Sequence, residues 1–133
     1  MKHTLLIITA LMLVVGFSNA QTHKGMEFYE SGEPKSIKTY KELNDKFELV
    51  KSISLYENGQ KEYERTYKDG KHDGLWTNWY ENGQKKEERT FKDGELDGLY
   101  TEWHKNGQKS VETTFKDGDF IEWTKWDKDG NKR

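Results

Sequence analysis

The chain has 133 residues, no cysteine and a formal net charge of −2. Its 22 Lys and Arg balance 24 Asp and Glu, so there is no basic field of the kind that a nucleic-acid binder needs. The lack of cysteine excludes disulfides and thiol chemistry, and the length fits one small domain.

Residues 1–20 have the organisation of a secretory signal peptide. A positively charged start precedes an apolar run from Leu5 to Val15, and the small residues Ser18 and Ala20 fit cleavage before Gln21. An uncleaved membrane anchor is the alternative, although a run of about 11 residues is short for crossing a bilayer. The sequence therefore predicts export to the periplasm, the cell envelope or the exterior.

Residues 21–52 are predicted to form a divergent N-terminal repeat that caps the rest of the chain. The segment 29–32 is similar to the turn sequences of the later repeats, and Pro34 suits an edge strand or an irregular cap because it has no N–H to donate. Apolar and polar residues alternate over 47–55, which predicts a long amphipathic strand.

Residues 53–133 contain a repeat of 24 residues, marked by Asn-Gly and Asp-Gly pairs that each recur at that interval. A fixed period of this length indicates one supersecondary unit copied along the chain. The pairs begin at Asn58, Asp69, Asn82, Asp93, Asn106 and Asp117.

The local sequence of each repeat is typical of β-hairpins. Asn-Gly between aromatic and β-branched residues predicts a hairpin with a type I′ turn, and Asp-Gly then turns the chain into the next hairpin. Two glycine turns in every 24 residues leave no room for a long helix. The predicted fold is all-β, an elongated antiparallel meander of stacked hairpins in a single-layer twisted sheet.

Two aromatic ladders are expected on opposite faces of this sheet, because successive side chains on a strand alternate. The second of the two ladders defined below could serve either core packing or partner binding, and the sequence leaves both roles open. Arg65 and Arg89 are expected to stack on this ladder. The first ladder, interpreted as core, consists of Leu55, Trp79, Trp103 and Trp126. The second consists of Trp76, Tyr100 and Trp123.

No pattern predicts catalytic residues, a metal or a cofactor. The recurring Glu64, Glu88 and Glu112 are interpreted as partners in cross-strand ion pairs on a solvated face. The segment 93–98 starts like a calcium loop, but its twelfth position is His104 instead of the required glutamate. Turn formation accounts for these Asp-Gly pairs without a metal.

The pattern Gly-x-Trp-x-x-Trp-Tyr-x-Asn-Gly, followed by Glu-x-Thr-Phe-Lys-Asp-Gly, resembles the MORN-repeat variant family of bacteria. Its clearest copies are residues 74–94 and 98–118, and the resemblance covers 53–130 well and 28–41 weakly. It implies β-hairpin repeats that contact proteins or membrane surfaces. Related bacterial chains are labelled antitoxins of toxin–antitoxin pairs, but the export signal here departs from a purely cytoplasmic role.

Together these features predict an exported, non-enzymatic repeat scaffold that binds a protein partner through an extended β-ribbon surface. One alternative is an antitoxin or immunity protein that neutralises a toxin; another is an envelope-surface module for glycans or lipid headgroups. No nucleic acid and no cofactor is expected, and the sequence leaves the oligomeric state open. The candidate partner-binding residues are Trp76, Tyr80, Arg89, Tyr100 and Trp123.

Overall fold

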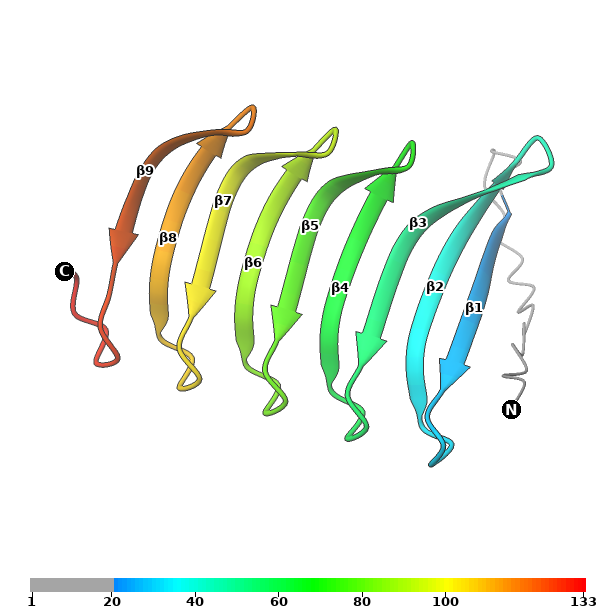
Figure 1. Cartoon of the computed structure of the whole chain (residues 1–133), viewed down its shortest axis with the longest axis horizontal. Helices are drawn as coiled ribbons and strands as arrows, with labels where there is room; N and C mark the ends of the chain where they lie inside the picture. The colour runs from blue at the N-terminus through cyan, green and yellow to red at the C-terminus, as the bar shows by residue number, and fades with distance from the viewer. Residues whose placement is uncertain (1–20) are drawn as a thin grey trace.

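The computed structural model describes residues 21–133, which form one sheet of nine antiparallel strands in sequence order (Figure 1). Each strand pairs with its neighbours in the chain, which confirms the predicted meander. The predicted signal peptide lies outside the described residues. The strands are β1 (Thr22–Phe28), β2 (Pro34–Leu43), β3 (Lys46–Leu55), β4 (Lys61–Lys68), β5 (Lys71–Trp79), β6 (Lys85–Lys92), β7 (Glu95–Trp103), β8 (Lys109–Lys116) and β9 (Asp119–Lys125).

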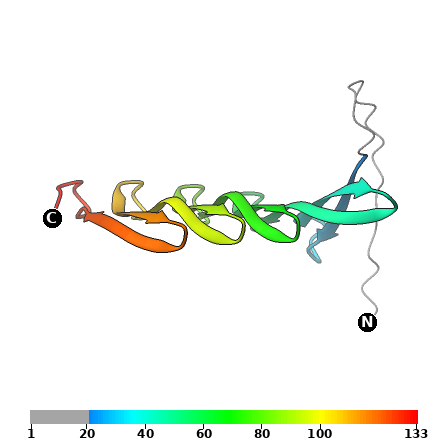
Figure 2. The ribbon, with the colours of Figure 1, turned by 90° about the horizontal axis from the view of Figure 1, so that it is seen from above.

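The sheet is a single layer, and within residues 21–133 no second element covers either of its faces (Figure 2). Among residues 21–133 no hydrophobic side chain is fully buried, so the ladder interpreted as core is only half-buried. A closed core needs two packed layers, and a single-layer meander shields side chains only by their neighbours in the sheet. The buried residues are instead small and polar, and each keeps a few per cent of its surface exposed: Ser36, Ser52, Ser54, Thr77, Thr101 and Thr113.

The strand register places the two ladders on opposite faces, as expected. Arg65 pairs with Trp76 across β4 and β5, Trp76 with Arg89, and Arg89 with Tyr100. Directly opposed residues of antiparallel strands point to the same side, and we call this side the arginine face. The other side, the glutamate face, carries Glu64, Glu88 and Glu112, which oppose Thr77 and Thr101.

The turns differ from the sequence prediction in their type. At Asp69 and Gly70 both residues have positive φ, 50° and 74°, as a type I′ turn requires, and the later Asp-Gly pairs repeat this geometry. At the first Asn-Gly pair only Gly59 has positive φ, 81°. The prediction of type I′ turns was therefore wrong for the Asn-Gly pairs, although both kinds of turn lie where they were predicted.

The Asn-Gly turns are three-residue loops that close on a glycine bulge. The amide of Gly59 donates to the oxygen of Tyr56 at 2.9 Å, and the amide of Tyr56 donates to the oxygen of Gln60 at 2.8 Å. The side chain of Asn58 accepts from the amide of Gln60 at 2.9 Å, an Asx interaction that fixes the asparagine without positive φ.

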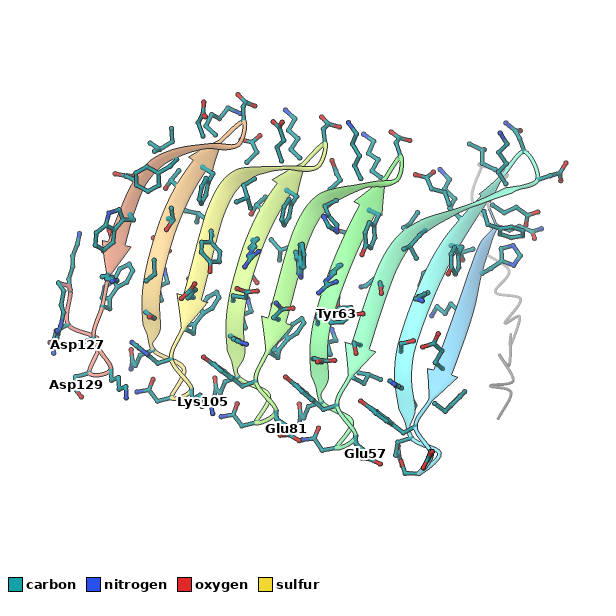
Figure 3. The ribbon with its side chains drawn as sticks, viewed as in Figure 1. Glu57, Tyr63, Glu81, Lys105, Asp127 and Asp129 are labelled. Carbon is teal, nitrogen blue, oxygen red and sulfur yellow. The ribbon has the colours of Figure 1, made fainter. Side chains whose placement is uncertain are left out.

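Side chains in these turns link each repeat to the next one. The hydroxyl of Tyr56 donates to the oxygen of Trp79 at 2.9 Å, and Asn58 donates through its amide nitrogen to the oxygen of Glu81, also at 2.9 Å. Tyr80 makes the same bond to the oxygen of Trp103. The row of turns runs across the sheet at one end of the strands, where Glu57, Glu81 and Lys105 are labelled (Figure 3).

The N-terminal segment is built like the later repeats. The hydroxyl of Tyr29 donates to the oxygen of Leu55 at 2.7 Å, which is the same inter-repeat bond one repeat earlier. The amphipathic strand predicted over 47–55 is β3, and a turn at Asn44 and Asp45 joins it to β2. Pro34 opens β2, a position where its missing N–H interrupts no later ladder bond.

Candidate functional site

The centre of the arginine face is a row in which cationic and aromatic side chains alternate across four strands. The guanidinium carbon of Arg65 lies 4.2 Å from the centroid of the Trp76 ring. The guanidinium carbon of Arg89 lies 5.6 Å from that ring and 5.0 Å from the ring of Tyr100. Each of these cation–π contacts contributes roughly 0.5–1 kcal/mol at a partly exposed site. Both arginines therefore stack on the ladder, as the sequence predicted.

Arg89 is neutralised within the sheet. Its guanidinium forms an ion pair with Glu87 at 2.9 Å. Partial burial works against the charged form, but the Glu87 carboxylate outweighs it and raises the pKa of Arg89. The guanidinium of Arg89 is thus held between the rings of Trp76 and Tyr100, and the carboxylate of Glu87 neutralises its charge.

Tyr100 is anchored by a neighbouring carboxylate. Its hydroxyl donates to the carboxylate of Glu102 and lies 3.5 Å from that of Glu87. Partial burial, followed by the hydrogen bond to Glu102 and the nearby negative charges, raises the pKa of Tyr100 well above its ordinary value of about 10. The phenol therefore stays neutral at physiological pH.

Arg65 has a different environment from Arg89. It lies between two rings, with its guanidinium carbon 3.9 Å from the centroid of Tyr63 and stacked on Trp76 from the other side. No carboxylate of residues 21–133 lies within ion-pair distance of it. The buried Nε of Arg65, like that of Arg89, and the indole nitrogen of Trp76 have no hydrogen-bond acceptor in the described part of the chain, so the two arginines differ in their ion pairing and not at Nε.

An aromatic cluster adjoins the row toward the Asp-Gly turns. The ring centroid of His72 lies 5.0 Å from that of Tyr67, 4.7 Å from that of Trp76 and 5.3 Å from that of Phe91. Partial burial and the charge of Arg65 lower the pKa of His72, which favours the neutral imidazole. The Trp76 ring therefore contacts His72 and Phe91 of this cluster as well as the two arginines of the row.

The open edge of the sheet carries exposed aromatic residues. Trp123 on β9 is 55% exposed, and its neighbours Phe120 and Ile121 are each 56% exposed. Trp123 opposes Thr113, which stands where the previous repeat has Arg89. Because threonine cannot stack, Trp123 is separated from the cation–aromatic row and forms an apolar patch at the edge.

The predicted binding residues do not form one continuous site. Trp76, Arg89 and Tyr100 are contiguous on the arginine face, whereas Trp123 lies at the sheet edge. Tyr80 lies in the row of turns, where its hydroxyl holds the next repeat.

The list of candidates left out several neighbours that the register brings together. Tyr63 and Arg65 complete the row, and His72 and Phe91 brace it. The Tyr-x-Arg spacing of residues 63–65 could have predicted that Tyr63 and Arg65 lie side by side, since alternate residues of a strand share one face.

The glutamate face repeats one arrangement along the chain. Lys61 lies over the ring of Trp79, 5.2 Å from its centroid, and forms an ion pair with Glu64 at 2.5 Å. These ion pairs lie within one strand, unlike the predicted cross-strand pairs, but Lys51 adds a cross-strand pair to Glu64 at 2.6 Å. Charges on this face satisfy one another, which suits a structural role. The matching contacts in the next repeats are Lys85–Trp103, Lys85–Glu88, Lys109–Trp126 and Lys109–Glu112.

Three further observations, on metal binding, on the segment compared with a calcium loop and on membrane-spanning helices, concern the described residues alone. No three His, Asp or Glu side chains of residues 21–133 lie in an arrangement that would hold a metal ion. The segment compared with a calcium loop forms a hairpin turn, and its Asp97 pairs with Lys116 at 3.0 Å. No helix in this part of the chain has the length and apolar character needed to cross a membrane.

Comparison with known proteins agrees with the repeat geometry. A family model described as MORN repeat variant matches residues 24–42, 51–69, 73–93 and 96–117. No curated protein and no solved structure matches the chain. The first matched segment spans most of β1 and β2, so the N-terminal hairpin belongs to the same repeat. The four matches cover more than half of the chain, which therefore belongs to the MORN repeat variant family and is a repeat scaffold.

Proposed function

We propose that this protein is an exported, non-enzymatic scaffold that binds a protein partner through the arginine face. The observation that carries the proposal is the row of stacked Arg, Trp and Tyr side chains on a face that no other element of the described residues covers. Tryptophan, tyrosine and arginine are the residues that most often dominate the binding energy of protein interfaces. Stacking also fixes their rotamers in advance, which reduces the entropy lost on binding.

The same row of side chains favours a protein as the partner, in preference to a glycan or an anionic membrane. Sugar rings stack on open aromatic faces, but both arginines approach the rings of the row and occupy that position. Attraction to anionic lipid needs a cluster of basic residues, whereas the chain as a whole carries a net charge of −2. An immunity role, in which the partner is a toxin met outside the cytoplasm, is a special case of this proposal.

The proposal is tested by recovering the partner and mapping its binding face. The full chain would be produced in its native host, crosslinked, and purified from envelope and secreted fractions. The recovered protein would then be purified and titrated against wild type, Tyr100→Ala and Trp103→Ala. Tyr100 lies on the arginine face, and Trp103 is its matched control on the glutamate face.

We expect Tyr100→Ala to weaken binding by on the order of tenfold or more, and Trp103→Ala to leave it nearly unchanged. Circular dichroism and the unfolding midpoint would show that both variants retain the sheet. Equal losses in the two variants would contradict the assignment of the face. Recovery of cell-wall glycan or lipid, with no saturable protein, would overturn the protein-binding role itself.

A further inference from the structure

Two successive repeats place the same arginine in two different electrostatic environments. Arg65 and Arg89 are 24 residues apart and occupy equivalent positions on β4 and β6. The residue two positions before Arg89 is Glu87, whose carboxylate lies 2.9 Å from the guanidinium. The residue two positions before Arg65 is Tyr63, which stacks on the guanidinium but brings no charge.

The guanidinium of Arg65 is therefore positioned but not neutralised. Two rings hold it at 3.9 Å and 4.2 Å, and no carboxylate among residues 21–133 pairs with it. The carboxylate of Glu62 accepts a hydrogen bond from the hydroxyl of Ser54 at 2.6 Å and keeps its charge, but it forms no ion pair with Arg65. A charged group that is partly desolvated without a counter-charge lacks the interaction that would offset its desolvation.

On this half of the arginine face Lys38 lies near Glu27 and the carboxylate of Glu62 accepts from Ser54, whereas the guanidinium of Arg65 forms an ion pair with no carboxylate of residues 21–133. Lys38 lies in the same row, because it opposes Ser52 and Ser52 opposes Arg65. Two strand spacings separate the two cations, about 9–10 Å, and the nearest acid to the Lys38 amine is Glu27 at 4.0 Å. The acids of the other half of the face are tied to Arg89 and Tyr100.

We propose that Arg65 binds a carboxylate of an acidic segment in the protein partner, with Tyr63 and Trp76 holding the guanidinium in position. The neighbouring repeat indicates the ligand, since at the equivalent position Arg89 binds the carboxylate of Glu87. Arginine matches a carboxylate through two parallel N–H donors, which a stacked guanidinium presents at its edge. The inference rests on the proposed function and names the chemistry of the partner that this face recognises.

The test exchanges the two environments. Tyr63→Glu gives Arg65 an internal carboxylate like that of Glu87, and Glu87→Gln frees Arg89 from its own. The probe is an acetylated and amidated peptide of alternating Glu and Ser, and the same peptide with Gln in place of Glu is the neutral control. Binding to the full chain would be followed by titration calorimetry and by the Nε–Hε resonance of Arg65.

We expect the Glu peptide to bind and to shift the Arg65 resonance, and the Gln peptide to do neither. Arg65→Gln and Tyr63→Glu should each weaken binding by about tenfold or more. Glu87→Gln should strengthen binding or add a second site, a gain that misfolding would not produce. Equal affinity of wild type and Tyr63→Glu, or equal binding of both peptides, would overturn the inference.

The same variants separate this inference from the proposed function. If the recovered partner loses affinity in Tyr100→Ala but not in Tyr63→Glu or Arg65→Gln, the face binds a protein and Arg65 is not its carboxylate anchor. If no protein partner is recovered while the Glu peptide still binds through Arg65, the proposed function fails and the carboxylate site stands. Vesicles of phosphatidylglycerol that bind through Arg65 in place of the peptide would reassign the site to lipid.

Discussion

The hydroxyl of Tyr56 donates a hydrogen bond to the main-chain oxygen of Trp79, which lies 23 residues later in the chain and 2.9 Å away. This bond joins consecutive repeats at their turns, where the ladder bonds between strands have ended. Partial burial and the nearby carboxylates of Glu62 and Glu81 raise the pKa of Tyr56, so the phenol remains protonated and able to donate. In a linear array, contacts of this kind set the stability of the whole, because each repeat touches only its neighbours.

Tyr56→Phe should therefore destabilise the protein while leaving the ring in place. We expect a loss of about 1 kcal/mol in the free energy of unfolding, because the carbonyl of Trp79 loses its side-chain donor. Urea unfolding measures the loss, and Tyr80→Phe should give a similar value because its hydroxyl bonds to the oxygen of Trp103 at 3.0 Å. Tyr40→Phe, which removes a hydroxyl within strand β2 instead of in an Asn-Gly turn, is the control. A loss as large in this control would argue against a specific role for the turns.

Glycines with the same backbone angle should differ in their tolerance of a side chain. Gly59 and Gly74 both have positive φ, 81° and 85°, and an added Cβ is strained at either. At Gly59 that Cβ meets no atom within 4 Å, whereas at Gly74 it lies 2.9 Å from the hydroxyl oxygen of Thr66. That hydroxyl cannot move freely, because it donates to the main-chain oxygen of Asp73 and lies 3.2 Å from that of Leu75.

We expect Gly59→Ala to cost about 1 kcal/mol of unfolding free energy, and Gly74→Ala to cost about 1–3 kcal/mol more through overpacking. Chemical denaturation of both variants measures the difference. Thr66→Ala combined with Gly74→Ala should recover part of the additional loss, because it removes the atom that clashes. Equal destabilisation by the two single variants would show that φ alone decides the cost.

The sequence was sufficient for those features that depend on spacing alone. The period of the Asn-Gly and Asp-Gly pairs places the turns from β3 to β9, and strand alternation assigns Trp76 and Trp79 to opposite faces, whereas the turn at Asn44 and Asp45 carries neither pair. The turn type depends on more than the dipeptide. Asn58 bonds both to its own loop and to the oxygen of Glu81 in the next repeat, and this long-range partner is visible only once the repeats are stacked.

The candidate site was only partly predictable for a similar reason. Trp76 and Tyr100 stand out in the sequence because they are aromatic and repeated. The difference between Arg65 and Arg89 comes from Tyr63 and Glu87, two residues that the repeat alignment treats as variable positions. The effect of this difference can be inferred only from the strand register, which places Tyr63 and Glu87 on the arginine face, each beside a guanidinium.

Export gives a prediction that needs no knowledge of the partner. If residues 1–20 are a signal peptide, the protein isolated from its host begins at Gln21. Mass spectrometry of the intact protein from the envelope and secreted fractions measures this directly. Ala20→Leu, which removes the small residue at the cleavage site, should leave the precursor uncleaved. A wild-type protein that keeps residue 1 would identify the segment as an uncleaved anchor or as part of the mature chain.

The stability of the protein should decrease in mild acid because of His72. Burial against Tyr67, Trp76 and Phe91 together with the charge of Arg65 lowers the pKa of His72 in the folded state. The unfolded chain, with an ordinary histidine pKa of about 6.5, then binds the proton more readily. The contribution of the neutral imidazole is complete above about pH 6.5 and is lost as the pH falls through the lower, folded-state pKa.

His72→Phe keeps an aromatic ring in the cluster but removes its titration. We therefore expect the difference in unfolding free energy between wild type and His72→Phe to change between pH 7.5 and pH 5, to the disadvantage of the wild type at acid pH. Urea unfolding at several pH values across this window measures the difference, with His104→Gln as the control for losing one histidine. A difference that stays constant would show that His72 has the same pKa in the folded and the unfolded protein. An equal change in His104→Gln would show that losing any histidine has this effect, so that the aromatic cluster is not its cause. The range from pH 7.5 to pH 5 separates His72 from the carboxylates. Partial burial works against the charged form of Glu64, but Lys51 and Lys61 outweigh it and lower the pKa of Glu64. Glu64 therefore affects stability only near and below the ordinary carboxyl pKa of about 4.3.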